Sequence, residues 1–490
     1  MMMAGIGRGR SAMLAPRPSG NQQTGVLLFW GAAVAGFAAI TVASLIASAD
    51  AAWAAFIPLI VLAGIVGVWV VARACQGNRP ALLVYFALLA FMTDALLRPR
   101  GAGETSADWE SLLKLAIWLG AGIIGLPHMA HLQKAFSRPG PVLLLIYVVV
   151  SLFSAFYAPD PTYSLGCAVS MAGLFAFAFA LSALLRAEQI LWTLVLSQAV
   201  FLSIGWVVFY VNPELGASPF YTVNGYIDRF CGIAGQADSM GSICAKYLGA
   251  IFLLWHAGRC KLIHAVPLAA LGLVSLIASD ARTAMIALAA GIAAVLLLRS
   301  RWGLAAFTFL GLTAFLLLQV TPLHMDGVMS GFSRSGDPSE LSTLTGRLEI
   351  WEFSIQKIQE SPIFGFGYNS SKVVLGQHLG FENGLMIDTA HNLWLQNMLS
   401  VGLLGTLPLL ALFVVLLVKA CRQPLPFRDF YVVVALIGGL ADNQAAGTTP
   451  TLLMLLFFTA AVWPDRPARA ASRSASGWES RPLSNGEDHA

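Results

Sequence analysis

Long apolar runs separated by short polar segments recur along the whole chain. Many of them approach the roughly 20 residues that an α-helix needs to cross a bilayer. About fourteen such runs lie at 26–48, 52–72, 81–97, 111–127, 141–158, 165–185, 189–211, 241–257, 262–279, 283–298, 302–320, 391–418, 429–447 and 451–463. Because the runs are continuous rather than alternating, they predict membrane-spanning helices and not barrel strands. We therefore expect an all-α polytopic membrane protein with about 12–14 transmembrane helices.

The composition supports this membrane assignment. Of 490 residues, 57% are hydrophobic and only 11% are charged, and the mean hydropathy is +0.74, whereas soluble domains carry about 25% charged residues. The polar, basic segment before the first run lacks a clear cleavage site, so we expect that run to be retained.

The sequence lacks the motifs that several common kinds of site would need. The six cysteines form no CxxC pair and no Cys/His metal spacing, so neither a metal site nor a disulfide framework is expected. A phosphate loop and a dinucleotide fingerprint are also missing from the sequence, which disfavours a nucleotide-driven pump. We expect no cofactor and no metal.

Lysine and arginine positions predict the orientation, because basic residues are retained on the cytoplasmic side of a membrane. With the N-terminus inside, the inner loops and both tails contain 19 of the 29 basic residues. The outer side then carries the longest connection, 321–390, together with three arginines that the rule disfavours, Arg229, Arg282 and Arg347. The net charge of +4 therefore reflects topology and does not indicate nucleic-acid binding.

Four charged residues fall inside apolar runs, namely Asp94, Lys114, Lys246 and Asp442. A charge near a helix centre costs roughly 2.5–3.5 kcal/mol on insertion scales, so these side chains should face the bundle interior or reach the interface. One alternative is a transporter or flippase in which they line a pathway. We find no internal repeat of the kind that marks many transporters.

Two outer stretches combine an arginine with a possible anion site. Arg229 opens RFCGIAG (229–235), whose glycines would let backbone N–H groups approach an anion; a glycine-rich turn is the simpler alternative. Arg282 is expected in the first turn of a span, with Ser279 or Asp280 available as the N-cap. A cation there opposes the helix dipole and suggests an anionic partner, although isolated interfacial arginines are usually anchors.

The third stretch, residues 344–369, predicts a short amphipathic helix that ends at Ser361-Pro362 and lies on the membrane surface. Its apolar stripe would contain Leu348, Trp351, Ile355 and Ile358. Arg347 precedes Trp351 by one helical turn. Binding of this arginine to lipid headgroups is as good an interpretation as a role in a site.

The fourth stretch, AHNLWLQ (390–396), places His391 and Asn392 at the start of an apolar helix. Alone, the histidine indicates only a helix start. On the same side as three outer arginines, it becomes a candidate for proton transfer, with Asn392 orienting it.

These four stretches, in this order and on the outer side, resemble the O-antigen ligase and polymerase superfamily of bacterial membrane glycan transferases. The matching motifs are RFCGIAG (229–235), SDARTA (279–284), TGRLEIW (345–351) with SPIFGFGY (361–368), and AHNLWLQNMLSVGLLG (390–405). The resemblance is strongest from about 221 to 419. It departs from the family at Gln236-Ala-Asp238, where a Pro-Asn pair is more common.

The resemblance implies roles for individual residues. Arg229, Arg282 and Arg347 would bind the diphosphate of a polyprenyl-linked glycan donor, His391 would be the catalytic base, and Arg282 would also assist the reaction. Supporting roles would fall to Asn392, Trp351 and Asp388.

General chemistry agrees with these roles. Arginine binds a diphosphate bidentately and cannot lose its proton, and fixed positive charges stabilise a leaving group without metal or ATP. A helix N-terminus and nearby arginines lower the pKa of a histidine, whereas Asp388 would oppose them. The family further implies a metal-independent, inverting transfer.

The acceptor is left open by the sequence. A ligase, slightly favoured, would move the glycan to a lipid A-core sugar, whereas an O-antigen or exopolysaccharide polymerase would use a lipid-linked repeat unit. A protein-glycosylating transferase is less favoured. The resemblance implies the periplasmic face of the bacterial inner membrane, with membrane lipids as partners and both termini cytoplasmic.

The expected organisation has five parts. These are a cytoplasmic tail (1–25), N-terminal membrane helices (26–220), a ligase-like core (221–419) that includes the periplasmic loop 321–390, C-terminal membrane helices (420–463) and a disordered cytoplasmic tail (464–490).

Overall fold

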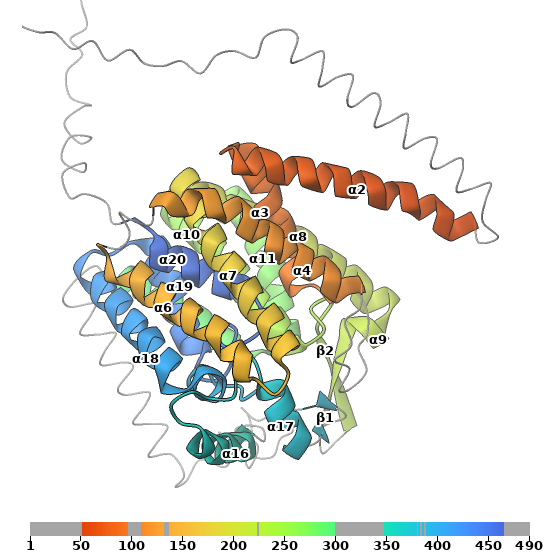
Figure 1. Ribbon diagram of the computed structural model, residues 1–490. Helices are drawn as coiled ribbons and strands as arrows, with labels where there is room; N and C mark the ends of the chain where they lie inside the picture. The colour runs from red at the N-terminus through yellow and green to blue at the C-terminus, as the bar shows by residue number, and fades with distance from the viewer. Residues whose placement is uncertain are drawn as a thin grey trace, which may run out of the picture. The chain divides into compact units, whose positions relative to one another are not determined.

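The computed structural model describes most of the chain between residues 51 and 464 (Figure 1). The described ranges are 51–96, 109–131, 137–222, 225–298, 347–379, 381–382, 385–386 and 389–464. The chain divides into two compact units, Met1–Val70 and Val71–Ala490. Residues 51–70 of the first unit belong to helix α2, Ala51–Cys75. The site described below lies within the second unit.

The second unit is an assembly of apolar helices, as the hydropathy pattern predicts. Its N-terminal part contains α3 Arg79–Asp94, α4 Trp109–Gly125, η1 Leu126–His131, α6 Pro139–Ser154, η2 Ala155–Tyr157, α7 Pro161–Leu184, α8 Ala187–Val211 and α9 Pro213–Gly216. Side-chain caps define several starts: Asn78 accepts from the amide of Ala81, and Asp160 accepts from that of Tyr163. Polar caps thus mark where apolar runs become helices.

The C-terminal part of this unit carries the outer motifs. Its helices are α10 Ala237–His256, α11 Leu262–Ser279, α12 Arg282–Leu297, α16 Arg347–Glu360, α17 Ser371–Leu379, α18 Leu393–Arg422, α19 Pro426–Gly438 and α20 Leu452–Val462. Helices α10 and α12 pack on each other, and α12 packs on α19. Helices α16 and α17 pack on each other and on α18 (Figure 1). These contacts bring the four motifs together.

Two small hairpins interrupt the helices. Strand β1 (Ala217–Thr222) pairs antiparallel with β2 (Gly225–Phe230), and the two-residue strands β3 (Phe381–Glu382) and β4 (Leu385–Met386) pair in the same way. In the first hairpin Ser218 lies opposite Arg229. Arg229 is the second-last residue of β2 and precedes the buried Phe230.

Seven helices in the described ranges are long and apolar enough to cross a membrane. They span Trp109–Met129, Pro139–Tyr157, Pro161–Leu184, Ala187–Val211, Ala237–His256, Leu262–Ser279 and Leu393–Arg422. Shorter apolar helices are Leu62–Cys75, Arg282–Leu297 and Leu452–Val462. The chain is therefore an all-α polytopic membrane protein, as predicted. The runs 26–48 and 302–320 lie outside the described residues, so the total of 12–14 spans stays a prediction.

One predicted span is wrong. The run 429–447 forms a helix only as far as Gly438, and residues 439–451 are a loop. Gly438-Gly439 and the polar cluster Asn443-Gln444 favour this ending over continuation of the helix. Asp442 therefore lies in a loop and not inside a membrane helix.

Candidate functional site

Three of the predicted site residues lie at or just before the beginnings of helices, whereas Arg229 lies in strand β2. Arg282 is the first residue of α12, Arg347 the first of α16, and His391 comes two residues before α18. Asp238 lies in the first turn of α10. Backbone N–H groups at helix starts are unpaired and the dipole there is positive, so the region favours an anion.

Arg229 is held tightly by neighbouring acceptors. Its Nε donates to the carbonyl of Ser279 at 2.9 Å, and its Nη2 donates to Oδ1 of Asp238 at 2.6 Å and to the carbonyl of Asp280 at 3.4 Å. Only 9% of the side chain is exposed. Ser279 ends α11, so Arg229 satisfies the last carbonyls of that helix and ties them to α10.

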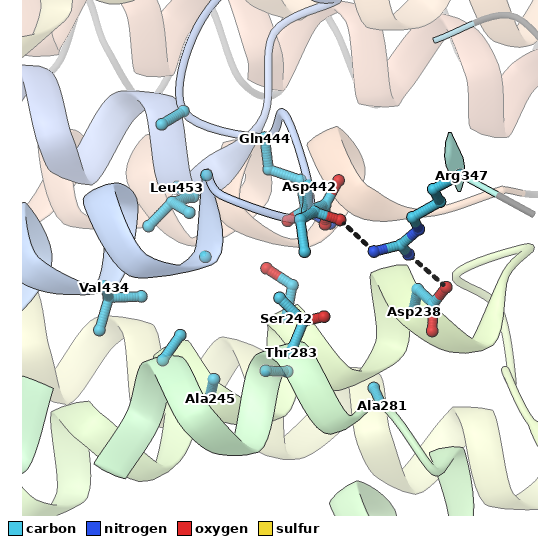
Figure 2. Close-up of a pocket in the computed structure, with 16 residues that line it drawn as sticks. Asp238, Ser242, Ala245, Ala281, Thr283, Arg347, Val434, Asp442, Gln444 and Leu453 are labelled. Atoms are coloured by element: carbon cyan, nitrogen blue, oxygen red, sulfur yellow. Dashed lines mark hydrogen bonds and ion pairs between the residues drawn. The ribbon is translucent and has the colours of Figure 1, made fainter. Parts of the chain in front are cut away.

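Arg347 connects α16 with two other parts of the unit. Its Nη1 donates to the carbonyl of Ala441 at 2.6 Å, and its Nη2 lies 3.8 Å from Oδ2 of Asp238. Figure 2 shows this side chain reaching between Asp238 and the segment that carries Asp442. One carboxylate, that of Asp238, therefore faces two of the three predicted arginines.

A partly open cleft lies against this pair. Its polar lining comes from Asp238, Ser242, Thr283, Arg347, Asp442 and Gln444, and much of the remaining lining consists of alanine and glycine (Figure 2). Alanines of α10 and α12 line the cleft beside the charged groups.

Arg282 stands beside the cleft, between the lining residues Ala281 and Thr283. Its Nε lies 3.6 Å from Oδ1 of Asp280, and 34% of its side chain is exposed, so this guanidinium is held more loosely than that of Arg229. The expected N-cap is wrong: Ala281 occupies that position without a side-chain hydrogen bond, and Asp280 instead ends α11 in a left-handed conformation (φ 45°).

His391 is partly buried and adopts the left-handed backbone region, with φ of 46°. Burial first, and then the positive charge of Arg347, lower the pKa of His391 to about 4, while Asp238 acts in the opposite direction. The imidazole is therefore neutral at pH 7 and can accept a proton. His391 thus belongs to the same electrostatic cluster as Arg347 and Asp238.

Side-chain hydrogen bonds fix the backbone on both sides of His391. The indole of Trp351 donates to the carbonyl of Ala390 at 3.0 Å, and Gln396 accepts from the Ala390 amide at 3.0 Å. Asn392 caps α18 by accepting from the amides of Trp394 and Leu395. Trp351 and Asn392 therefore hold the chain around the histidine, whereas Asp388 lies outside the described residues.

The stripe predicted for the α16 region differs from the observed one. Ile350 and Ser354 are buried, whereas Leu348 and Ile355 are exposed. Ile350 packs with Leu375 and Leu399, so α16 directs its buried face toward α17 and α18. The helix itself is present where it was predicted.

The loop 439–451 is a part of the site that sequence reasoning missed. Its carbonyls accept hydrogen bonds from other segments: Gly439 from the Leu393 amide, Leu440 from Asn392 and Ala441 from Arg347. Burial raises the pKa of Asp442 in this loop to about 6. The Gly438-Gly439 pair and Pro450 were the signals that could have revealed the loop.

The motif SPIFGFGY (361–368) supplies backbone hydrogen-bond partners at a break in membrane helix α18. Helix α18 has a non-helical residue at Gly402 (φ 57°, ψ −159°). Around this break, the amides of Phe366 and Gly367 donate to the carbonyls of Leu399 and Ser400. In return, the amides of Leu403 and Leu404 donate to the carbonyls of Pro362 and Ile363. The motif satisfies backbone groups that the break leaves unpaired, as the apolar interior of a bilayer requires of every backbone polar group.

The charges inside the membrane helices are paired. Lys246 Nζ lies 2.8 Å from Oδ2 of Asp94, and Lys114 Nζ lies 2.8 Å from Oε1 of Glu110. Asp94 also accepts from the amide of Leu452 through Oδ1. These pairs offer a structural role for charges that the transporter alternative placed along a pathway.

Comparison with known proteins identifies a family for the central part of the chain. Residues 267–410 match the O-antigen ligase family. No curated protein matches the chain. The matched range includes Arg282, Arg347, Trp351 and His391, and it supports membership of the O-antigen ligase superfamily.

Proposed function

We propose that this chain, a member of the O-antigen ligase superfamily, transfers a glycan from a polyprenyl-diphosphate carrier to a sugar hydroxyl. The family match supports a ligase- or polymerase-type function in surface polysaccharide biosynthesis. In this proposal the enzyme works at the periplasmic face of the bacterial inner membrane, with both termini in the cytoplasm.

The observation that carries the proposal is the grouping of Arg229, Arg347 and His391 around Asp238. The two guanidiniums approach one carboxylate at 2.6 and 3.8 Å. The carboxylate marks a position where an anion is bound by two arginines, and Arg282 stands nearby beside Asp280. Carboxylates and phosphates are bound by guanidinium groups with the same paired geometry.

The proposed reaction assigns one task to each group. His391 accepts the proton of the acceptor hydroxyl, whose oxygen forms a bond to the anomeric carbon of the donor sugar. The bond between that carbon and the diphosphate oxygen breaks, and the diphosphate leaves with the electron pair. Arg282 and Arg347 stabilise the negative charge on the leaving group. Attack opposite the leaving group inverts the anomeric centre, and no metal enters these steps.

Arg229 has a more structural part in this scheme. Three acceptors already bind it, so its main contribution is to hold the end of α11 and hence the Asp280–Arg282 turn. Arg282 and Arg347 are the more available ligands. Asn392 and Trp351 position His391 through the backbone.

The acceptor separates the two versions of the proposal. We favour a ligase that uses a lipid A-core sugar, and the alternative is a polymerase that uses a lipid-linked repeat unit. The test is to supply the full chain, reconstituted in lipid nanodiscs, with lipid-linked glycan donor and each acceptor separately. Product on the lipid A-core supports the ligase, and product on the lipid-linked unit supports the polymerase. Absence of transfer to both acceptors would contradict the proposed function.

A further inference from the structure

Asp238 is the acid at the centre of the arginine cluster. Its Oδ1 accepts from Arg229 at 2.6 Å and its Oδ2 lies 3.8 Å from Arg347. The side chain is 42% exposed. It lines the cleft, as Figure 2 shows. Both oxygens are therefore directed at guanidiniums, while the group itself stays accessible to solvent and to a ligand.

The Asp238 carboxylate and a diphosphate would compete for the same donors. On Arg229, the Nε is occupied by the Ser279 carbonyl within a buried contact, whereas Nη2 donates to Asp238 at 2.6 Å and more distantly, at 3.4 Å, to the Asp280 carbonyl. On Arg347, Nη1 is occupied by the Ala441 carbonyl and Nη2 is directed at Asp238. On each arginine, Nη2 is thus the group that an anion can gain by replacing the carboxylate.

The balance of charges around the cleft also favours competition between the Asp238 carboxylate and a diphosphate. Three cations, Arg229, Arg282 and Arg347, face carboxylates from Asp238, Asp280 and Asp442. The cluster is close to neutral without a ligand. A diphosphate brings further negative charge next to Asp238, and like charges at short range repel unless one of them moves away. Asp280 does not contribute to the cleft lining among the described residues, whereas Asp238 and Asp442 do. Of these two acids, Asp238 is the one that pairs with both Arg229 and Arg347.

We propose that Asp238 is an internal counter-anion that sets the affinity of the site for its donor. Its carboxylate holds Arg229 and Arg347 in place in the donor-free protein. The diphosphate of the donor then takes over both Nη2 groups, and the carboxylate turns toward solvent. This inference rests on the proposed function, because it takes a diphosphate as the ligand.

The test compares two aspartates that carry the same charge. Asp238→Asn removes the charge but keeps a carbonyl oxygen that can accept from the arginines. Asp228→Asn is the matched control, because Asp228 is exposed on β2 beside Arg229 in sequence and does not line the cleft. The probe is inorganic diphosphate, titrated into the full chain in nanodiscs by calorimetry.

We expect Asp238→Asn to bind inorganic diphosphate about tenfold more tightly than the wild type. The diphosphate then displaces a neutral amide and not a charged carboxylate, whose charge-assisted hydrogen bonds to the arginines are stronger. Asp228→Asn should bind as the wild type does. The KM for the lipid-linked donor should fall with Asp238→Asn, whereas simple structural damage would raise KM and lower the thermal midpoint.

Two results would overturn the inference. Unchanged binding in Asp238→Asn would mean that the carboxylate does not compete with the ligand, and weaker binding at a wild-type thermal midpoint would make it an organiser of the arginines. Failure of the proposed function is distinguishable, because the wild type would then neither bind diphosphate nor transfer glycan from the lipid-linked donor.

Discussion

Gly365 and Gly402 pack backbone against backbone, since a Cβ built on Gly365 would lie 2.7 Å from the amide nitrogen of Gly402. Both residues have positive φ, 69° and 57°. This contact joins SPIFGFGY (361–368) to the break at Gly402 in α18, the helix that begins two residues after His391. The motif glycines therefore have a structural purpose that is separate from chemistry.

Alanine at Gly402 should destabilise the protein strongly. The observed φ and ψ suit glycine almost exclusively, and a side chain there would overlap the backbone of Ile363. Backbone strain of this kind costs about 1–3 kcal/mol before the overlap is counted. We expect a lower thermal midpoint and less monodisperse protein. Gly166→Ala is the control, because a Cβ at Gly166 meets nothing within 4 Å. Equal midpoints for both variants would contradict the packing described here.

The protonation of His391 can be measured from its reaction with diethyl pyrocarbonate, which modifies only neutral imidazole. Since burial and Arg347 lower the pKa to about 4, the neutral form persists as pH falls from 8 to about 5 and is lost near pH 4. Peptide mass spectrometry should give a midpoint well below the value of about 6.5 for free imidazole. Arg347→Gln should raise the midpoint and Asp238→Asn should lower it. A wild-type midpoint near 6.5 would show that His391 is not held neutral by its surroundings.

The buried pair between Lys246 and Asp94 makes a prediction about stability. Lys246 is 1% exposed, so Lys246→Met leaves the Asp94 charge without its partner in the interior. Breaking a buried pair in this way costs about 3–5 kcal/mol. The double variant Lys246→Met/Asp94→Asn removes both charges and keeps an acceptor for the Leu452 amide. Its thermal midpoint should exceed that of Lys246→Met alone, and a lower midpoint would argue against a simple structural pair.

Much of the architecture could be predicted because membrane helices follow from apolar run length. The same rule failed at 429–447, where a run of suitable length contains the Gly438-Gly439 pair and ends in a polar loop. It also treated 391–418 as one helix, although Gly402 breaks it. Hydropathy measures solvent preference and does not register which distant backbone groups pair across a break.

The site could be predicted in part. The order of the motifs predicted Arg229, Arg347 and His391 as site residues. The sequence around each of them does not show that all three lie near the same residue. Asp238 entered the sequence analysis only as a departure from a common motif, yet it is the group that both arginines face. The loop carbonyl that binds Arg347 belongs to Ala441, whose side chain carries no chemical signal. Such relationships depend on tertiary contacts between segments far apart in the chain.

The most direct test of the account is glycan transfer by purified protein in nanodiscs supplied with lipid-linked donor and acceptor. We expect His391→Ala and Arg282→Ala each to lower the rate by at least about a hundredfold, the usual scale for loss of a general base or a charge-stabilising group. Arg259→Ala, which removes an exposed arginine that pairs with Glu188 away from the cleft, should retain the wild-type rate. Transfer at the wild-type rate by both the His391 and the Arg282 variants would contradict the assignment of this cluster as the active site.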